Sequence, residues 1–457
     1  MYNVFNLLTT TFIFITLNII RLTNQKYPDN KTEPEYLYNF TTLPFTNASQ
    51  EYIDKGQYHA FPQAIRVSPN GELFISVPRH IFSNDIASSI PGTINKIYNN
   101  TLIPWPTLES NDYINGDIKS VVGFEIDLEG RLWLLNHSKD KREILVYNKK
   151  GQKVKTFDLS SATTHKEHTS YLTTIRLDMK NKYAYITDTG RLLNDTQQMN
   201  TKSNLIVVNL ETELSIKILQ KDISTKPNFN YNNTIKNIGL YGLALSCDKS
   251  TLYYSPLKSN EIFSLQTSKL RDQHIIRGDI DIHKSNKSVA SFEMILSARG
   301  IFYYTAIEDN GIYVNFYESE YKFEPKTLRR IGHDSNKHND TINEIPTSLT
   351  FNSTTGYLLY LVNRYQYFMT DVNQRIDPNK INFQIMNVYV NDRSYLYPCN
   401  LLYYMDNYLL VIIVMVALSI SYGIIYIIRF VSKIDKEEKS NKEEHGQELL
   451  MLSGKFN

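Results

Sequence analysis

The sequence has few of the residues and motifs that mark metalloproteins and most hydrolases. Its 457 residues include two cysteines, Cys247 and Cys399, too few for a zinc site built from cysteine pairs. The two could form a disulfide in an oxidising compartment, although their spacing does not show proximity. The chain has neither a phosphate-binding P-loop nor a G-x-S-x-G nucleophile elbow. We therefore predict no metal and no cofactor, and the catalytic residues, if any, are unknown.

The chain also lacks an excess of charge of one sign. Lysine and arginine number 49, aspartate and glutamate number 47, and the formal net charge is +2, with both signs interspersed. Nucleic-acid-binding proteins carry a basic stripe or a recognisable motif, and neither is present here. We predict no nucleic-acid partner.

A twelve-residue phrase recurs along the middle of the chain. Each copy alternates apolar and polar residues, passes through a polar turn and continues as a second apolar run, as in AIRVSPNGELFI and GFEIDLEGRLWL. This alternation predicts strands, and the Asn and Gly residues of the turns suit hairpins. The copies start at Ala64, Gly123, Thr174, Gly242 and Ser348, with a fainter copy at Gly300.

The spacing of the copies indicates the fold. Successive starts lie 59, 51, 68, 58 and 48 residues apart, which leaves room for four strands and their loops in each unit. One hairpin cannot bury both its faces, whereas units stacked radially can. We predict an all-β fold, a six-bladed β-propeller over residues 56–400. A β-sandwich with chance similarity between its strands is the alternative.

The N-terminal region indicates export. Residues 1–25 hold a short apolar stretch interrupted by Asn and Thr, which suits a secretory signal peptide, and an uncleaved anchor is the alternative. Residues 26–55 form a polar lead-in that could supply the closing strand of the last blade. Sequons permit glycosylation, and we predict a glycoprotein. They lie at Asn30, Asn39, Asn47, Asn99, Asn136, Asn194, Asn232, Asn286, Asn339 and Asn352.

Residues 409–430 are long and apolar enough to cross a bilayer, with no charge before Arg429. A buried core helix is the alternative. Basic residues follow this segment, and the positive-inside rule then places the tail in the cytosol. We predict a single-pass type I protein of the plasma membrane or a secretory-pathway membrane, with the propeller extracellular or lumenal. Residues 431–457 form a charged cytosolic tail, which we expect to be disordered.

Seven short phrases, in order, carry a resemblance to a known family. They include LFISVPR at 73–79, YAYITD at 183–188, LYYSPL at 252–257 and NRYQ at 363–366. The others lie at 91–95, 102–106 and 126–135. Together they resemble the Yellow and major royal jelly protein family.

The resemblance implies a secreted six-bladed propeller with a ligand tunnel near its axis. Members of the family convert dopachrome or bind small molecules such as biogenic amines and sterols. The chain departs from the family pattern, because Glu129 replaces one cysteine and a second is missing near Val314. The usual disulfides are therefore absent, and a transmembrane helix is not typical. These differences favour a divergent, membrane-anchored member.

Propellers place their sites at the axial mouth, where the inner strands begin. The residues predicted at these positions include no carboxylate, so a lactonase-type metal site is not expected. Their hydroxyl groups and aromatic ring suit a small polar-aromatic ligand. Arg66 and Glu125, at matching positions of two inner strands, are expected to pair between blades. The mouth positions are Gln63, Val122, Thr173, Tyr241, Arg299 and Thr347.

The predicted ligand-binding residues come from two sources. The resemblance implies Asn363 and Tyr365, because the late phrase contributes to the pocket of amine-binding members, and more loosely Thr347. Tyr365 could stack on an aromatic amine. Tyr241 and Thr173 are mouth positions. Asp188 could neutralise an amine, although capping the turn at Gly190 is the favoured interpretation. All of them could equally be ordinary strand-end residues.

Our leading functional hypothesis is a surface-anchored propeller of this kind that binds a small ligand, an aromatic amine or similar, at its axis. One alternative is an enzyme, a dopachrome-converting isomerase. Another is an adhesion or structural ectodomain. No activated base or nucleophile is visible in the sequence, which leaves binding and catalysis unseparated.

Overall fold

The computed structural model describes residues 34–79, 82–163, 170–190, 203–220, 222–228, 238–272, 281–287, 289–308, 311–316, 329–331, 345–364, 375–399 and 407–453. The chain divides into two compact units, the first ending at Cys399 and the second starting at Asn400. The predicted signal peptide lies outside the described residues.

Six antiparallel four-stranded sheets make up the first unit. In three of them the strands are β2 (Ile65–Val67), β3 (Leu73–Ser76), β4 (Ile94–Tyr98) and β5 (Thr101–Pro104); β6 (Val121–Ile126), β7 (Leu132–His137), β8 (Arg142–Tyr147) and β9 (Lys153–Asp158); and β10 (Leu172–Asp178), β11 (Tyr183–Asp188), β12 (Asn204–Asn209) and β13 (Ser215–Ile218). In the other three they are β14 (Leu240–Leu245), β15 (Thr251–Pro256), β16 (Glu261–Gln266) and β17 (His283–Asn286); β18 (Met294–Leu296), β19 (Ile301–Ala306), β20 (Gly311–Phe316) and β21 (Arg329–Ile331); and β22 (Ile345–Asn352), β23 (Tyr357–Asn363), β24 (Phe383–Tyr389) and β1 (Glu35–Phe40).

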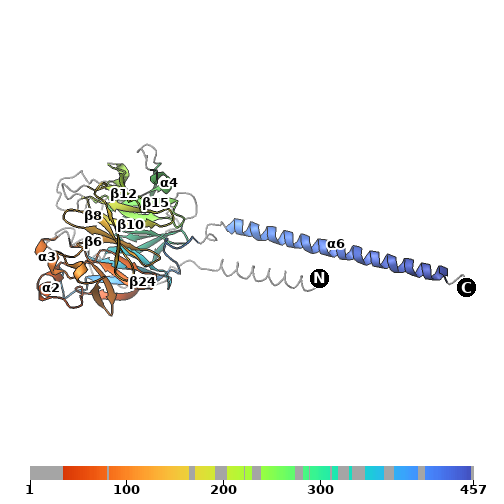
Figure 1. Cartoon of the computed structure of the whole chain (residues 1–457), viewed down its shortest axis with the longest axis horizontal. Coiled ribbons are helices and arrows are strands. Elements are labelled where there is room, and N and C mark those ends of the chain that lie inside the picture. The colour runs from red at the N-terminus through yellow and green to blue at the C-terminus, as the bar shows by residue number, and fades with distance from the viewer. Residues whose placement is uncertain are drawn as a thin grey trace. The chain divides into compact units, whose positions relative to one another are not determined.

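The sheets follow one another around a central axis (Figure 1). The first strand of each sheet is its innermost one, and β2, β6, β10, β14, β18 and β22 contact their neighbours in this order. Strand β22 in turn contacts β2, which closes the ring. Apolar side chains from facing sheets fill the space between the blades. This arrangement confirms the predicted all-β propeller.

The last sheet joins the two ends of the first unit. Strand β1 pairs with β24, with Glu35 opposite Asn387 and Phe40 opposite Phe383. The segment predicted as a lead-in therefore supplies the outermost strand of this blade. The sequence analysis had named this closing strand as one possible role of the segment. The sheet-forming region begins at Glu35 and not at residue 56.

The recurring phrase owes its regularity to a capped turn. The last residue of each inner strand, or the residue directly after it, carries a side-chain oxygen that accepts a hydrogen bond from a backbone N–H two to five residues later. Gly71 and Gly130 take the positive φ that two of these turns need. The capping residues are Ser68, Asp127, Asp178, Ser246, Ser297 and Asn352.

The sixth copy of the phrase was placed in the wrong register. Ser297 caps its turn, and Gly300 lies inside that turn with φ +74°. The inner strand is therefore β18, and the copy begins at Glu293. The apolar run of β19, Ile301–Ala306, was mistaken for the inner strand because it is the longer of the two. Arg299 consequently lies in the hairpin and not at the axial mouth.

The helices of the first unit are short. They are α2 (Gln50–Asp54), α3 (Asn84–Ser89) and α4 (Thr267–Leu270), with 3-10 turns at η1 (Gly56–Tyr58), η2 (Glu109–Asn111) and η3 (Ile223–Thr225). Each is capped locally or sits in a connection between strands, so the sheets alone define the architecture.

The second unit holds one long helix, α6 (Asn407–Ser453). Within it, Ala417–Lys442 contains a stretch that is long and apolar enough to be a candidate membrane span. The expectation that the tail is disordered is wrong for the residues up to Ser453, which continue the helix. Ion pairs at i,i+4, such as Lys442 with Glu438 at 2.7 Å, favour helical structure there, and no proline interrupts it.

Burial separates the predicted glycosylation sites, which leads to a first prediction. Asn136 is fully buried, and its side-chain amide binds Lys119 N and Glu143 Oε1. Asn39, Asn47, Asn99 and Asn286 are exposed. If the chain is exported, peptide mass spectrometry is expected to find glycans on these four exposed residues and none on Asn136. A glycan on Asn136 would contradict the described packing.

Candidate functional site

Side chains fill the axis of the propeller at three successive levels. The first level lies where the inner strands begin. Gln63 precedes β2, and Tyr241 lies on β14, the inner strand on the opposite side of the ring. The Gln63 amide Nε2 donates a hydrogen bond to the Tyr241 hydroxyl across the axis. The Tyr241 ring packs edge-on against Phe292 at 5.3 Å. The two side chains therefore bridge the mouth.

Two of the predicted residues lie side by side next to Gln63. Asn363, at the end of β23, donates from Nδ2 to Thr347 Oγ1 at 3.1 Å and to the Pro62 carbonyl at 2.9 Å. All three residues are on neighbouring segments of the first and last blades. The structure thus brings Asn363 and Thr347 to the same place as the Gln63–Tyr241 bridge.

Thr173 extends this network on the other side of the axis. Its Oγ1 lies 2.9 Å from Thr187 Oγ1 and 3.0 Å from Thr189 Oγ1. Thr187 Oγ1 in turn donates to the Tyr241 carbonyl at 3.2 Å. Hydroxyl and amide groups on both sides of the axis are therefore hydrogen-bonded to one another or to the backbone beside Gln63 and Tyr241. We call Gln63, Thr173, Thr187, Tyr241, Thr347 and Asn363 the mouth network.

Asp188 is engaged elsewhere. Its carboxylate accepts hydrogen bonds from the Ser170 hydroxyl, the Tyr171 N–H and the Gly190 N–H, at 2.8, 2.8 and 3.1 Å. Burial raises its pKa above the usual value, although these three donors oppose the shift. The turn-capping interpretation accounts for these contacts. The other predicted residue, Tyr365, lies outside the described residues.

One acceptor in the mouth network is left without a partner. Gln63 Oε1 is buried and has no hydrogen-bond partner in the part of the chain that the structure describes. A buried polar atom of this kind costs free energy unless a donor reaches it. The position is therefore suited to an N–H or O–H group of a bound molecule.

The second level of the axis is a buried ion cluster, the axial quartet of Arg66, Glu125, Arg176 and Glu293. Arg66 contacts both carboxylates, Glu293 at 2.6 Å and Glu125 at 3.4 Å. Arg176 also contacts both, Glu293 at 2.8 Å and Glu125 at 3.2 Å. The four side chains come from four inner-strand segments, and their formal charges cancel. The expected pairing of Arg66 with Glu125 is confirmed.

Glu293 is the most tightly held member of the quartet. Burial alone would raise its pKa, but the two guanidinium groups and the Ser348 hydroxyl lower the pKa to about 2. Its Oε2 also accepts from Ser348 Oγ at 2.7 Å and from the Leu349 N–H at 2.8 Å. The carboxylate is therefore ionised and saturated with donors, and it ties the fifth sheet to the first, third and sixth.

The sequence analysis missed Glu293. The register error replaced Phe292 by Arg299 at the mouth, so the corrected mouth positions still carry no carboxylate. Glu293 is the next residue along, the first of its copy, and this position was not considered. The signal that could have found it is the turn-capping serine, Ser297, which matches Ser68 and Ser246 in the other copies. Among the described residues, no group of three or more His, Cys, Asp or Glu side chains is placed to hold a metal ion.

The third level is formed by the segment that follows the last strand. Residues 390–399, which we call the strap, cross the hairpin end of the axis, and Tyr395 inserts there fully buried. The Leu177 N–H donates to the Tyr395 hydroxyl at 2.9 Å, and this hydroxyl lies 3.5 Å from Glu125 Oε2. Tyr395 therefore closes the lower end of the axis beneath the quartet.

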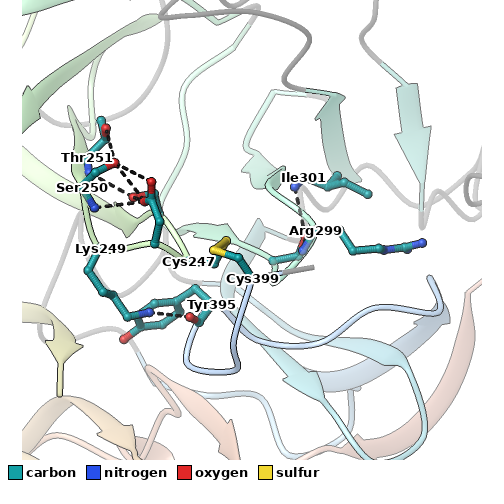
Figure 2. Close-up of a disulfide and its surroundings, with 11 residues drawn as sticks. Cys247, Lys249, Ser250, Thr251, Arg299, Ile301, Tyr395 and Cys399 are labelled. Carbon is teal, nitrogen blue, oxygen red and sulfur yellow. Dashed lines mark hydrogen bonds between the residues drawn. A yellow bond between two sulfur atoms is a disulfide. The ribbon is translucent and has the colours of Figure 1, made fainter. Parts of the chain in front are cut away.

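A disulfide fixes the end of the strap. Cys247, in the turn between β14 and β15, is bonded to Cys399, with the two Cα atoms 5.3 Å apart. Figure 2 shows the bond beside Lys249, whose Nζ donates to the Tyr395 carbonyl at 2.5 Å. The pairing that the sequence left open is thus formed.

A separate cavity of about 380 Å³ lies away from the axis. Phe74 and Trp105 contribute its aromatic wall, and the hairpins at residues 68–72 and 128–132 form its sides. None of the mouth-network residues lines it. We therefore treat it as distinct from the candidate site.

The chemistry available at the mouth is that of hydrogen bonding. The network offers hydroxyl and amide groups of no net charge, and the charges below it are neutralised within the quartet. Within the described residues of the network, no nucleophile is paired with a base. The arrangement can orient a small polar molecule by directed hydrogen bonds.

Comparison with known proteins shows which family the chain resembles. The sequence model described as major royal jelly protein matches residues 119–399. The chain is 28% identical to major royal jelly protein 3 of Apis mellifera over 174 residues, which cover 35% of this chain and 30% of that protein. It is 23% identical to protein yellow of Drosophila yakuba over 346 residues, 65% of this chain and 60% of that protein. The chain thus spans less than two thirds of the length of both relatives.

Among solved structures, a luciferin-regenerating enzyme is similar with a TM-score of 0.47 and 11% identity, over 75% of this chain and 95% of that chain. The match to the family model is more informative, because it covers more than half of the chain and runs through five of the six copies of the phrase. The chain belongs to the Yellow and major royal jelly protein family.

Proposed function

We propose that this protein is a surface-anchored propeller that binds a small ligand, an aromatic amine or a similar molecule, at the mouth network. The observation that supports this most is the asymmetry of the axis. Tyr395 and the axial quartet fill its lower levels, whereas the mouth carries neutral polar groups and an acceptor, Gln63 Oε1, with no partner among the described residues. A ligand N–H would satisfy that acceptor.

The ligand is held from several blades in this proposal. Asn363 and Thr347 contact it from the last blade, Tyr241 and Thr173 from the opposite side, and Gln63 receives its donor group. Tyr365 is the proposed stacking partner of the aromatic ring. The ammonium charge is met by carbonyl and hydroxyl oxygens, because the carboxylate of Asp188 is occupied by its turn.

Membrane anchoring completes the proposal. Helix α6 contains the candidate span, and basic residues such as Lys433 and Lys436 follow its apolar part. We propose that the propeller lies on the extracellular or lumenal side and the charged end in the cytosol. Protease protection in sealed vesicles, with an epitope at each end, tests this topology.

The second prediction concerns a single hydroxyl. Tyr241→Phe is expected to weaken the binding of tryptamine about tenfold, because a buried hydrogen bond and the orientation of Gln63 are lost. Isothermal calorimetry on the full chain in detergent micelles measures the affinity, with a catechol and a sterol as comparison ligands.

Tyr254→Phe is the matched control for this test. Tyr254 lies in the same sheet and is equally buried, but its hydroxyl contacts Ser224, away from the axis, at 2.8 Å. This variant should bind tryptamine as the wild type does. Equal affinities in all three proteins would reject the mouth network as the site. Turnover of dopachrome that is lost in Asn363→Ala would instead support the isomerase alternative.

A further inference from the structure

The strap is attached to the propeller by individual hydrogen bonds and an ion pair, and it is not a strand of any of the six sheets. Two backbone hydrogen bonds join it to the fifth blade, from Ala298 N to the Arg393 carbonyl at 2.9 Å and from Tyr395 N to the Leu296 carbonyl at 3.1 Å. An ion pair between Arg299 and Asp392, at 3.2 Å, holds its beginning. Further hydrogen bonds join Val390 N to the Gly356 carbonyl and Ser394 N to Ser353 Oγ, both at 3.1 Å. A segment held by such individual bonds, outside the ladders of the sheets, opens more readily than the sheets around it.

Apart from the peptide bond that continues β24 into the strap, the disulfide is the one covalent link between the strap and the blades in the described part of the chain. Cys247 lies on the fourth blade, and Cys399 is the last strap residue, so the bond holds the C-terminal end of the segment. Tyr395 lies between this end and the anchored beginning. The aromatic ring can therefore leave the axis only if the strap is released at one side, and Cys399 is half-buried and accessible to a small reductant.

The strap and the mouth are connected through the quartet. The Tyr395 hydroxyl contacts Glu125, and the Arg176 guanidinium lies 6.0 Å from the Tyr395 ring. Arg176 in turn contacts Glu293, which accepts from Ser348 and Leu349. Ser348 is the neighbour of Thr347 in the mouth network. The three levels of the axis are thus joined by direct contacts.

We propose that the strap is a redox-controlled latch: the Cys247–Cys399 disulfide keeps Tyr395 in the lower end of the axis, and its reduction releases the strap and loosens the quartet under the mouth. The reductant is a dithiol. One thiolate attacks a cysteine sulfur, the cysteine Sγ–Sγ bond breaks, and a mixed disulfide forms. The second thiol then closes the dithiol to its own disulfide and leaves two protonated cysteine thiols.

Limited proteolysis tests the latch without any ligand. Arg393 is exposed in the strap, so trypsin can cut after it once the backbone is free to enter the protease. With dithiothreitol as the dithiol, cleavage of the full chain in micelles at Arg393–Ser394 is expected to accelerate at least tenfold. Cys399→Ser should be cut at the fast rate with or without dithiothreitol. Cleavage at the exposed Lys150 hairpin serves as the internal control and should not change. An unchanged rate at Arg393 would overturn the proposal.

Hydrogen exchange distinguishes a released strap from general unfolding. On reduction, the amides of Leu177, Ala298 and Tyr395 should exchange faster, while those of β7 and β8 should keep their protection. Faster exchange throughout the propeller would overturn the latch, because the disulfide would then stabilise the whole fold.

The effect on the mouth rests on the proposed function and has its own readout. Reduced protein is expected to bind tryptamine at least threefold more weakly than oxidised protein. Equal affinities despite a released strap would overturn the coupling between strap and mouth. Absence of binding in the oxidised wild type would reject the proposed function, while proteolysis and exchange would still decide whether the latch exists.

Discussion

Replacing Glu293 by glutamine is expected to lower the free energy of unfolding by about 3–5 kcal/mol, the range found when one partner of a buried ion pair is removed. The amide cannot neutralise Arg66 and Arg176, which remain buried with Glu125 as their only carboxylate partner in the quartet. Urea denaturation followed by intrinsic fluorescence measures the change.

Glu72→Gln is the control for this experiment. Glu72 also pairs with a cation, Lys96, but this pair is partly exposed to solvent, whereas the quartet is buried. Its loss should cost less than about 1 kcal/mol. A Glu293→Gln variant as stable as Glu72→Gln would contradict the picture of the quartet as the closed centre of the axis.

The same variant changes the response to acid. The pKa of Glu293 is lowered from 4.5 to about 2, so its ionised form stabilises the folded state above pH 4.5. This stabilisation is lost as the pH falls towards 2. The difference in stability between wild type and Glu293→Gln should therefore be constant near neutral pH and should shrink below pH 4.5. If the stability difference between wild type and Glu293→Gln grew as the pH fell, the lowered pKa of Glu293 would be contradicted.

Replacing Arg79 by methionine is expected to lower the free energy of unfolding by about 3 kcal/mol, because several buried carbonyl groups would lose their donor at once. The guanidinium donates to the carbonyls of Ile90 at 2.9 Å, Asn111 at 2.6 Å, and Lys119 and Ile118 at 3.0 and 3.1 Å. It thereby holds the connection from β5 to β6 against the first blade. Calorimetric melting measures the effect.

Arg131→Met is the matched control for Arg79. Its guanidinium contacts Asp127 at 2.6 Å and lies over the Trp133 ring, but it is partly exposed and binds no set of carbonyls. We expect a loss of at most about 1 kcal/mol for this variant. If both substitutions lowered the free energy of unfolding equally, the loss in Arg79→Met could not be attributed to the carbonyl groups that Arg79 binds.

The repeated phrase predicted the inner strands wherever its turn was marked in the sequence. Pro69-Asn70-Gly71 and Glu129-Gly130 mark two turns clearly, and the strands around them are where the phrase placed them. The turn after β18 reads Ser297-Ala298-Arg299-Gly300, without a Pro-Asn-Gly or Glu-Gly signal. Strand β18 is as short as β2, with three residues each, so without a marked turn the longer apolar run of β19 was taken for the inner strand.

The strap could not be predicted from its sequence. Residues 390–399 have no period of either a helix or a strand, and their place depends on contacts with residues more than a hundred positions away, such as Leu177 and Lys249. More of the candidate site could be predicted from the sequence. Asn363 came from the family phrase and Tyr241 from its place before the inner strand, whereas the contact between Gln63 and Tyr241 follows only from the closure of the ring.

A crystal structure of the full chain with bound tryptamine tests the central claim most directly. The account predicts one ligand at the mouth network, with its amine within hydrogen-bond distance of Gln63 Oε1 and with Tyr395 still closing the lower end of the axis. A ligand found instead in the cavity beside Phe74 and Trp105, with the mouth unchanged, would contradict it.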